Sequence, residues 1–233
     1  MSSSPVTLWP ETIAGRTSTI ARAFCSANAR TLRAPSYLGF WGTSFGGGHV
    51  LKIGSEFKEV VAIISQVPHL SGLSSLHMNS LPKILALTLH GLYDGLRAAI
   101  GLKPHYVLSS AEPDHLALMN APNQSQGYLG MVSEGMTLDQ RVAARFGLFV
   151  GLYSPVSALR KLTVPVLMQV GINDVITPAA PAYKAASRYP NVDLKKYDSG
   201  HFEPYFEPLF STVAGDQMAF LANHLGTSGK SGE

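Results

Sequence analysis

Short apolar runs alternate with helical patterns along most of the chain. Residues 37–41, 60–66 and 164–170 are rich in β-branched or aromatic side chains, and residues 193–197 form a shorter, more polar run. A glycine-rich segment with helical spacing follows the first run, and an alanine-rich segment at 178–188 precedes the last. Strands separated by helices pair in parallel, with the helices as crossover connections. The pattern therefore predicts an α/β protein with a mostly parallel sheet.

Residues 70–161 interrupt this alternation. Two apolar stretches within them, 81–100 and 138–152, have helical spacing, and links rich in proline, asparagine, glutamine and serine join them. An insertion of this size between two strands lies at the carboxyl edge of the sheet, where open α/β sheets bind ligands. We therefore predict a helical lid over a site at that edge; the alternative is a purely structural layer of helices.

The sequence divides into three parts. Residues 37–225 form the α/β domain with its lid, residues 1–36 an irregular leader or remnant helix, and residues 226–233 a flexible tail. The leader contains four arginines and one acidic residue, a composition that weakly resembles a transit peptide. The single cysteine, Cys25, excludes an internal disulfide and a thiolate metal site, which suits a reducing compartment such as the cytoplasm.

Composition narrows the function further. Of the 233 residues, 45% are hydrophobic and 14% are charged, enough apolar surface for a folded core. The net charge of +3 comes without a lysine or arginine block, so we expect no nucleic-acid partner. No apolar run reaches the length of about 18 residues that a membrane span needs. The histidines show no metal-ligand spacing with acids, and we expect no metal and no cofactor.

Residues 42–46, Gly-Thr-Ser-Phe-Gly, match the G-x-S-x-G pattern of a nucleophile elbow. By chance alone the pattern is expected about 0.2 times in a chain of this composition, so the match is weak by itself. Here it follows a predicted strand and opens a predicted helix, the setting in which a strained turn exposes the serine hydroxyl. Ser44 is therefore a candidate nucleophile, with an ordinary helix cap as the alternative.

A serine nucleophile needs a base, and the base needs an orienting acid. His201 lies in a loop just beyond the last predicted strand, and Asp174 follows the strand before it. His224, near the end of the final helical pattern, is the less favoured base, and Asp198 is too near His201 in sequence to be the preferred acid. The order Ser44, Asp174, His201 predicts a catalytic triad. Taken singly, Asp174 could be a turn former and His201 a loop residue.

His49 follows Ser44 by five residues and offers a different choice. One turn of helix would bring its ring toward the site, whereas a packed histidine is the more common arrangement. We favour packing.

The chain resembles the α/β-hydrolases. In particular it is similar to a branch that includes fungal hydrolase-like enzymes of secondary metabolism, among them polyketide transferases. The segments that carry the resemblance are residues 38–51, 65–68, 165–178 and 199–202.

The resemblance implies acyl transfer from an ester or thioester through an acyl-Ser44 intermediate. In that chemistry His201 is the base, Asp174 orients it, and the backbone N–H of Phe45 is one oxyanion donor. The enzyme would be a hydrolase if water accepts the acyl group, or an acyltransferase if an alcohol does. A polyketide synthase is then a possible acyl donor.

The sequence departs from this family before the elbow. The family has four strands there, and the loop after the third supplies a second oxyanion donor. Residues 1–36 contain no convincing strand and no such loop, so we expect a partial sheet with residues 37–41 at its edge. An apolar edge favours pairing with another chain, and we expect a homodimer or aggregation. The alternative function is that of a truncated, impaired relative that acts as a binding or interaction protein.

Overall fold

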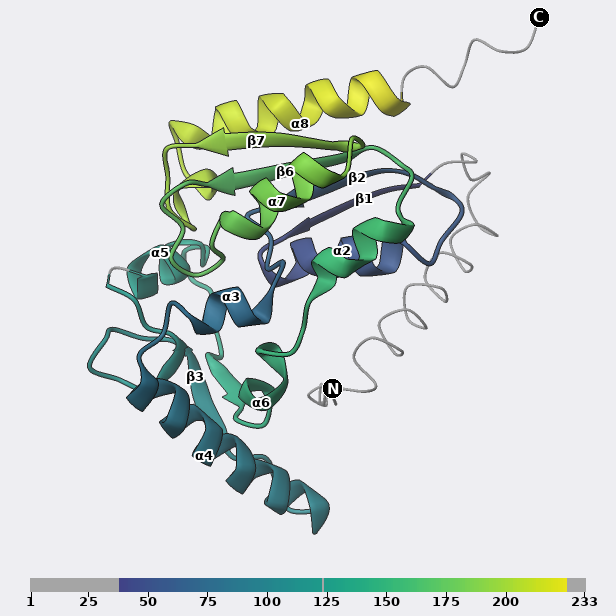
Figure 1. The fold of residues 1–233 in the computed structure, drawn as a ribbon. Coiled ribbons are helices and arrows are strands. Elements are labelled where there is room, and N and C mark those ends of the chain that lie inside the picture. Colours follow the sequence, from purple (N-terminus) through teal and green to yellow (C-terminus); the bar gives the residue numbers. More distant parts are fainter. Residues whose placement is uncertain (1–37, 123, 226–233) are drawn as a thin grey trace, which may run out of the picture.

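The computed structural model describes residues 38–122 and 124–225 (Figure 1). The predictions for the leader, for Cys25 and for the tail lie outside these residues. Four parallel strands make the main sheet in the order β1-β2-β6-β7. Their bounds are Leu38–Thr43 for β1, Val60–Gln66 for β2, Val166–Gly171 for β6 and Val192–Tyr197 for β7. The predicted α/β fold with a mostly parallel sheet is confirmed.

Helices cover both faces of this sheet (Figure 1). On one face lie α2 (Phe45–Gly54), the 3₁₀ helix η1 (Pro155–Lys161) and α7 (Ala180–Arg188). On the other face lies α8 (Leu209–Leu225), which follows a short 3₁₀ helix, η2 (Glu203–Tyr205). The central strands β2 and β6 therefore bury side chains on two sides, as the apolar run of β2 requires.

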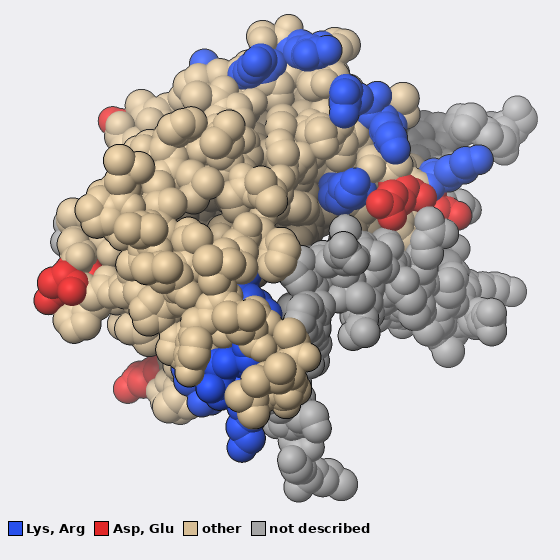
Figure 2. Space-filling model, turned by 60° about the horizontal axis from the view of Figure 1, so that its bottom comes forward, with Lys and Arg blue, Asp and Glu red and all other residues tan. Residues whose placement is uncertain are grey.

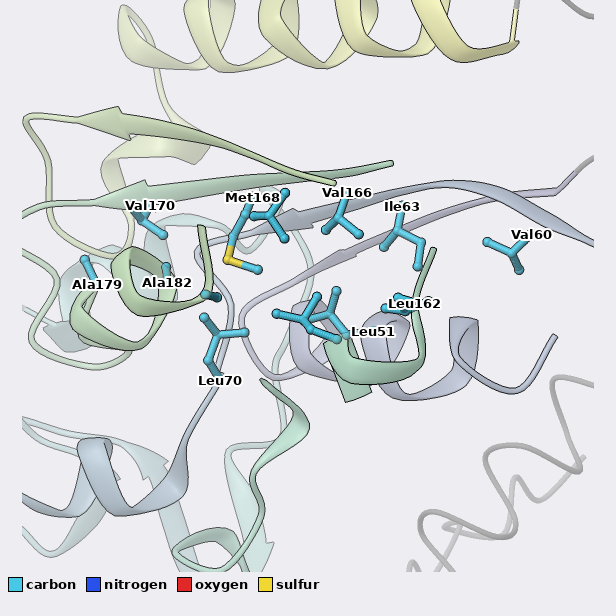
Figure 3. Packing of buried hydrophobic residues seen from close by; sticks show 13 residues of the cluster. Leu51, Val60, Ile63, Leu70, Leu162, Val166, Met168, Val170, Ala179 and Ala182 are labelled. Atoms are coloured by element: carbon cyan, nitrogen blue, oxygen red, sulfur yellow. The ribbon is translucent and has the colours of Figure 1, made fainter. Parts of the chain in front are cut away.

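The main hydrophobic core fills the space between the sheet and the first group of helices. Figure 3 shows Ile63, Val166 and Met168 pointing from the strands toward Leu51 and Leu162. A smaller cluster lies under α8 on the opposite face; its members are Ala62, Ile64, Leu167 and Phe220. Close packing on both faces fixes the height and tilt of the strands, and hence the positions of the loops at their carboxyl ends.

The insertion between β2 and η1 forms a separate layer below the sheet in Figure 1. Its longest element is α4 (Leu81–Ala99), which confirms the helix predicted at 81–100. The other elements are α3 (Gly72–Leu76), β3 (Tyr106–Ser110), β4 (Ala117–Met119), α5 (Gln124–Gly130), β5 (Arg141–Ala143) and α6 (Phe146–Val150). The three strands form a small sheet in the order β4-β3-β5, which the sequence pattern did not predict.

The helix predicted at 138–152 is wrong. Residues 141–143 instead pair antiparallel with β3, and only residues 146–150 are helical. Gly147 and Gly151 weaken a helix here because glycine has low helix propensity. Between the two short elements the backbone N–H of Arg145 donates to Asp94 of α4, which ties the chain to α4 at that point.

A buried ion pair holds the insertion together. The Asp94 side chain is fully buried and accepts from Arg145 Nε at 2.6 Å, from Arg145 Nη2 at 2.9 Å and from the backbone N–H of His105 at 2.6 Å. Burial by itself would raise the pKa of Asp94, but these hydrogen bonds hold it below its usual value. One carboxylate thus joins α4 to the residues beside β3 and α6.

Removing that carboxylate should loosen the insertion. In Asp94→Ala the buried Arg145 guanidinium loses this carboxylate, and breaking a buried ion pair typically costs about 3–5 kcal/mol. We expect faster amide hydrogen exchange in α4 and β3, with unchanged protection in β2 and β6. Asp139→Ala is the matched control, because Asp139 forms an exposed ion pair with Arg141 and its loss should leave exchange nearly unchanged. Equal exchange in the two variants would contradict the role given to Asp94.

Strand β1 lies at the edge of the main sheet within the described residues. Trp41 on this strand is 53% exposed, yet its Nε1 donates to Gln217 of α8 at 3.0 Å. This hydrogen bond joins the edge strand β1 to α8 of the same molecule. Pairing of this edge with a second copy stays a prediction.

Charged side chains are few on the face shown in Figure 2 and lie mainly toward its margins. Within residues 38–122 and 124–225, no helix is long and apolar enough to cross a membrane. The same part of the chain contains no group of three or more histidine, cysteine or acidic side chains that could hold a metal ion.

Candidate active site

Ser44 occupies a strained turn between β1 and α2. Its φ of 52° and ψ of −123° lie outside the regions that L-residues ordinarily adopt. The backbone holds this conformation from both sides, because Ser44 N donates to Gln66 O at 2.9 Å and Ser44 O accepts from His69 N at 2.9 Å. Such a turn directs the serine hydroxyl away from the strand, as a nucleophile elbow requires.

The two glycines of the motif have different roles. A Cβ added to Gly42 would lie 2.4 Å from Gly46 O and 2.8 Å from the Val50 side chain, so only glycine fits at the end of the strand. A Cβ added to Gly46 would meet no atom within 4 Å. Close approach of strand and helix therefore depends on Gly42 alone.

The structure brings Ser44, His201 and Asp174 into one hydrogen-bonded chain. His201 Nε2 lies 2.9 Å from Ser44 Oγ, and His201 Nδ1 lies 2.6 Å from Asp174 Oδ2. His201 and Asp174 are 2% and 5% exposed, so the ion pair that forms when His201 accepts a proton is shielded from water. The hydrogen bonds assign the Nδ1–H of His201 to Asp174 and leave Nε2 to accept from Ser44.

Thr177 holds the Asp174 carboxylate in place, and the sequence analysis missed it. Its backbone N–H donates to Asp174 Oδ1 at 2.7 Å, and that of Ile176 donates to the same oxygen at 2.8 Å. The Thr177 hydroxyl lies 2.7 Å from Asp174 Oδ2 and 3.0 Å from the backbone O of Val67. An aspartate followed three residues later by threonine, just before a helix, is a turn signal that could have identified this role.

The other candidates lie elsewhere. His224 packs its ring against Phe220 at the end of α8, and Asp198 accepts from the Asn173 side chain at 2.8 Å. His49 is a packed histidine, as favoured from the sequence, because its Nδ1 lies 2.6 Å from the Tyr153 hydroxyl.

Phe45 is the first residue of α2, so no carbonyl of its own helix can accept its backbone N–H.

A cavity of about 900 Å³ opens beside Ser44. Ser44, Phe45 and Thr177 line it from the sheet domain, and residues of α3, α4, β4 and α6 line it from the insertion. The insertion therefore encloses the space over Ser44 together with the sheet domain. The volume is that of a site for a small organic ligand.

Aromatic rings connect the elbow to the insertion. The Phe45 ring lies 4.6 Å from His49, 5.3 Å from His69, 5.4 Å from Phe146 and 5.2 Å from Tyr153, measured between ring centroids. Burial lowers the pKa of His69 to about 4 and also lowers that of His49. Both histidines are therefore neutral near pH 7 and add no positive charge beside Ser44.

A serine elbow after one strand, an acid and a histidine after two later strands, and helices on both faces of a parallel sheet define the α/β-hydrolase fold. This chain has that fold.

Comparison with known proteins agrees with this assignment. A quorum-quenching protein, AidA of Acinetobacter baumannii (strain MDR-ZJ06), is 38% identical over 188 residues, which cover 80% of this chain and 62% of AidA. No protein-family model matches the chain.

Two crystal structures are similar in fold. The α/β-hydrolase GrgF from a Penicillium species superposes with a TM-score of 0.66 at 17% identity, over 91% of this chain and 73% of GrgF. The monoacylglycerol lipase of Paleococcus ferrophilus superposes with a TM-score of 0.64 at 13% identity, over 91% of this chain and 76% of the lipase.

The two motif glycines give a matched test of the elbow. In Gly42→Ala the added methyl group would clash with Gly46 O and the Val50 side chain. The shift that relieves this clash should lower the free energy of unfolding by about 1–3 kcal/mol, and Tm by about 2–4 °C for each kcal/mol. Gly46→Ala should leave Tm unchanged or raise it, because alanine favours helix by about 1 kcal/mol over glycine. Calorimetry measures both. Equal destabilisation of the two variants would show that the close approach at Gly42 is not the constraint.

Proposed function

We propose that this protein is a serine-dependent acyl-transfer enzyme that acts on an ester or thioester. The observation that supports the proposal most strongly is the unbroken hydrogen-bonded chain from Ser44 through His201 to Asp174 beside a cavity. Because one relative is named a quorum-quenching protein, quorum-sensing signal molecules are among the compounds to test as substrates.

In the first half of the reaction, Ser44 Oγ attacks the carbonyl carbon and His201 Nε2 takes the hydroxyl proton. Asp174 stabilises the imidazolium so formed through the hydrogen bond at Nδ1. The backbone N–H of Phe45 donates to the oxyanion. Collapse of the tetrahedral intermediate breaks the bond to the alcohol or thiol, which leaves with the proton from His201, and an acyl-Ser44 remains.

In the second half, an acceptor hydroxyl attacks the acyl-enzyme while His201 removes its proton. The bond between the acyl carbon and Ser44 Oγ then breaks, and His201 returns the proton to Ser44 Oγ. Water as the acceptor releases a free acid, and an alcohol gives a new ester. Because Ser44, His201 and Asp174 act in the same way in both cases, the acceptor alone separates a hydrolase from an acyltransferase.

The nucleophile can be tested directly. We expect a fluorophosphonate probe to label the wild type and not Ser44→Ala, because the probe reacts only with an activated serine. Asp174→Asn should slow labelling by up to about 10⁴-fold, since loss of the carboxylate favours the wrong tautomer of the histidine. Ser55→Ala is the matched control, because Ser55 lies beyond the far end of α2 and its hydroxyl donates to the backbone O of Lys52. Equal labelling of wild type and Ser44→Ala would refute the nucleophile; no labelling of the wild type would favour the binding-protein alternative.

The acceptor is the second question within this proposal. Acyl transfer to an alcohol, as in the polyketide transferases that the sequence resembles, needs a site that keeps water from the acyl-enzyme. The largely apolar residues of the insertion around the cavity support that possibility. A thioester delivered by a polyketide synthase would then be the acyl donor.

Product analysis separates the two reactions. Mass spectrometry after incubation with an acyl thioester, with and without a primary alcohol, should give the free acid from a hydrolase in both cases. An acyltransferase should give a new ester that appears only when the alcohol is added. Ser44→Ala should form neither product above the background.

A further inference from the structure

The cavity holds a cation that the proposed chemistry does not use. Among the described residues, Lys83 is the one lysine or arginine that lines the cavity it shares with Ser44. Its Nζ donates to the backbone O of Leu118 at 3.1 Å and to the side-chain oxygen of Asn120. An ammonium carries three N–H donors, so these two neutral acceptors leave one for a ligand.

No acidic side chain among the described residues forms a salt bridge with Lys83. Asp114 also lines the cavity, but it bonds His115 Nδ1 at 2.8 Å and its side chain is three-quarters exposed. An ammonium taken out of water without a counter-ion is costly, and burial lowers the pKa of Lys83 to about 8. The group is still mostly protonated at neutral pH and would gain from an anion.

The position of Lys83 on its helix supports the same conclusion. The first turn of a helix carries the positive end of the macrodipole, so a cation there is unfavourable for the helix. Lys83 lies in the first turn of α4, which contains no acidic residue. Its charge therefore does not serve helix stability, and the helix end adds to the positive potential in this part of the cavity.

From these observations, and on the basis of the proposed function, we infer that the acyl group of the substrate carries an anionic group, most simply a carboxylate, which Lys83 binds. Ser44 then attacks the ester or thioester carbonyl at the other end of the same acyl chain. Apolar side chains of the cavity would contact the methylene groups of that chain; they include Ile84, Leu87, Phe146 and Val150. The substrate class is thus a half-ester or half-thioester of a dicarboxylic acid.

Matched esters test this inference. The substrates are mono-p-nitrophenyl esters of dicarboxylic acids of increasing length, each compared with its methyl-capped counterpart, which lacks only the charge. We expect the wild type to prefer the free acid in kcat/KM at one or more lengths, mainly through a lower KM. Lys83→Met should reduce that preference by about 10- to 100-fold, the usual effect of a hydrogen bond between charged groups.

The control variant is Lys103→Met. Lys103 lies in the same insertion, does not line the cavity, and its loss changes the net charge equally. Lys103→Met should leave kcat/KM unchanged for both the free acids and the methyl-capped esters. An equal preference in the wild type and Lys83→Met would overturn the inference, as would an equal loss on both substrates, because that result indicates a structural role through Leu118 and Asn120.

A binding measurement separates this inference from the proposed function. Titration calorimetry on Ser44→Ala, which cannot turn substrate over, should show tighter binding of monomethyl octanedioate than of dimethyl octanedioate. The difference should disappear when Lys83→Met is added. If fluorophosphonate labelling is normal and the two ligands bind alike, only the anion site is refuted. If labelling fails while the half-ester still binds through Lys83, the acyl-transfer chemistry is refuted and the anion site remains.

Discussion

The parallel register of the main sheet is the constraint on which the site depends. Thr43 pairs with Gln66, and Gln66 pairs with Gln169, so the carboxyl ends of β1, β2 and β6 are level. Ser44 follows directly on this row, while Asp174 and His201 come from the loops beyond β6 and β7. A shift of one residue in any strand would turn its side chains to the opposite face and move the following loop. The two apolar cores oppose such a shift because each face of the sheet buries a different set of side chains.

A polar network stabilises the same carboxyl ends of the strands from the side of α8. The Gln217 side chain donates to the side-chain oxygens of Gln66 and Gln169, each at 2.7 Å, and Gln169 in turn donates to Tyr197 OH at 2.7 Å. The amides of Gln66 and Gln169 are buried in the central strands, where an unpaired group would be costly. The hydrogen bonds between them are satisfied only in one register and with α8 in one position. Because other arrangements would leave these amides unpaired, the network favours the one arrangement that brings the triad residues together.

The sequence predicted the sheet and the candidate triad for a physical reason. Buried parallel strands appear as uninterrupted apolar runs, and functional loops in this fold begin where those runs end, so Ser44, Asp174 and His201 could be read from short segments. The small sheet of the insertion could not, because strands of three residues such as β4 and β5 are too short to show a period. The segment at 138–152 has helical spacing, yet its tertiary contacts with β3 and Asp94 outweigh its local preference.

Gln66, Gln169 and Lys83, which were missed in the sequence, share one property, which is that their surroundings come from distant segments. Gln66 and Gln169 look like polar ends of apolar strands until α8 is placed beside them. Lys83 looks like a solvent-exposed residue of an amphipathic helix, because its acceptors on Leu118 and Asn120 lie 35 and 37 residues further along the chain. The local sequence pattern predicts which side chains of a segment are buried. It does not predict contacts with distant segments, and the roles of these residues depend on such contacts.

The two parts of the site are therefore held by different forces. Ser44, His201 and Asp174 belong to the sheet domain, which two apolar cores and the glutamine network fix in place. Lys83 and most of the cavity wall belong to the insertion, whose elements depend on the buried pair of Asp94 and Arg145 and on a sheet of short strands. Changes in the insertion can alter the shape and charge of the cavity without disturbing the register that sets the triad. In the proposed function, the reaction type is consequently set by the sheet, and the choice of substrate by the inserted layer.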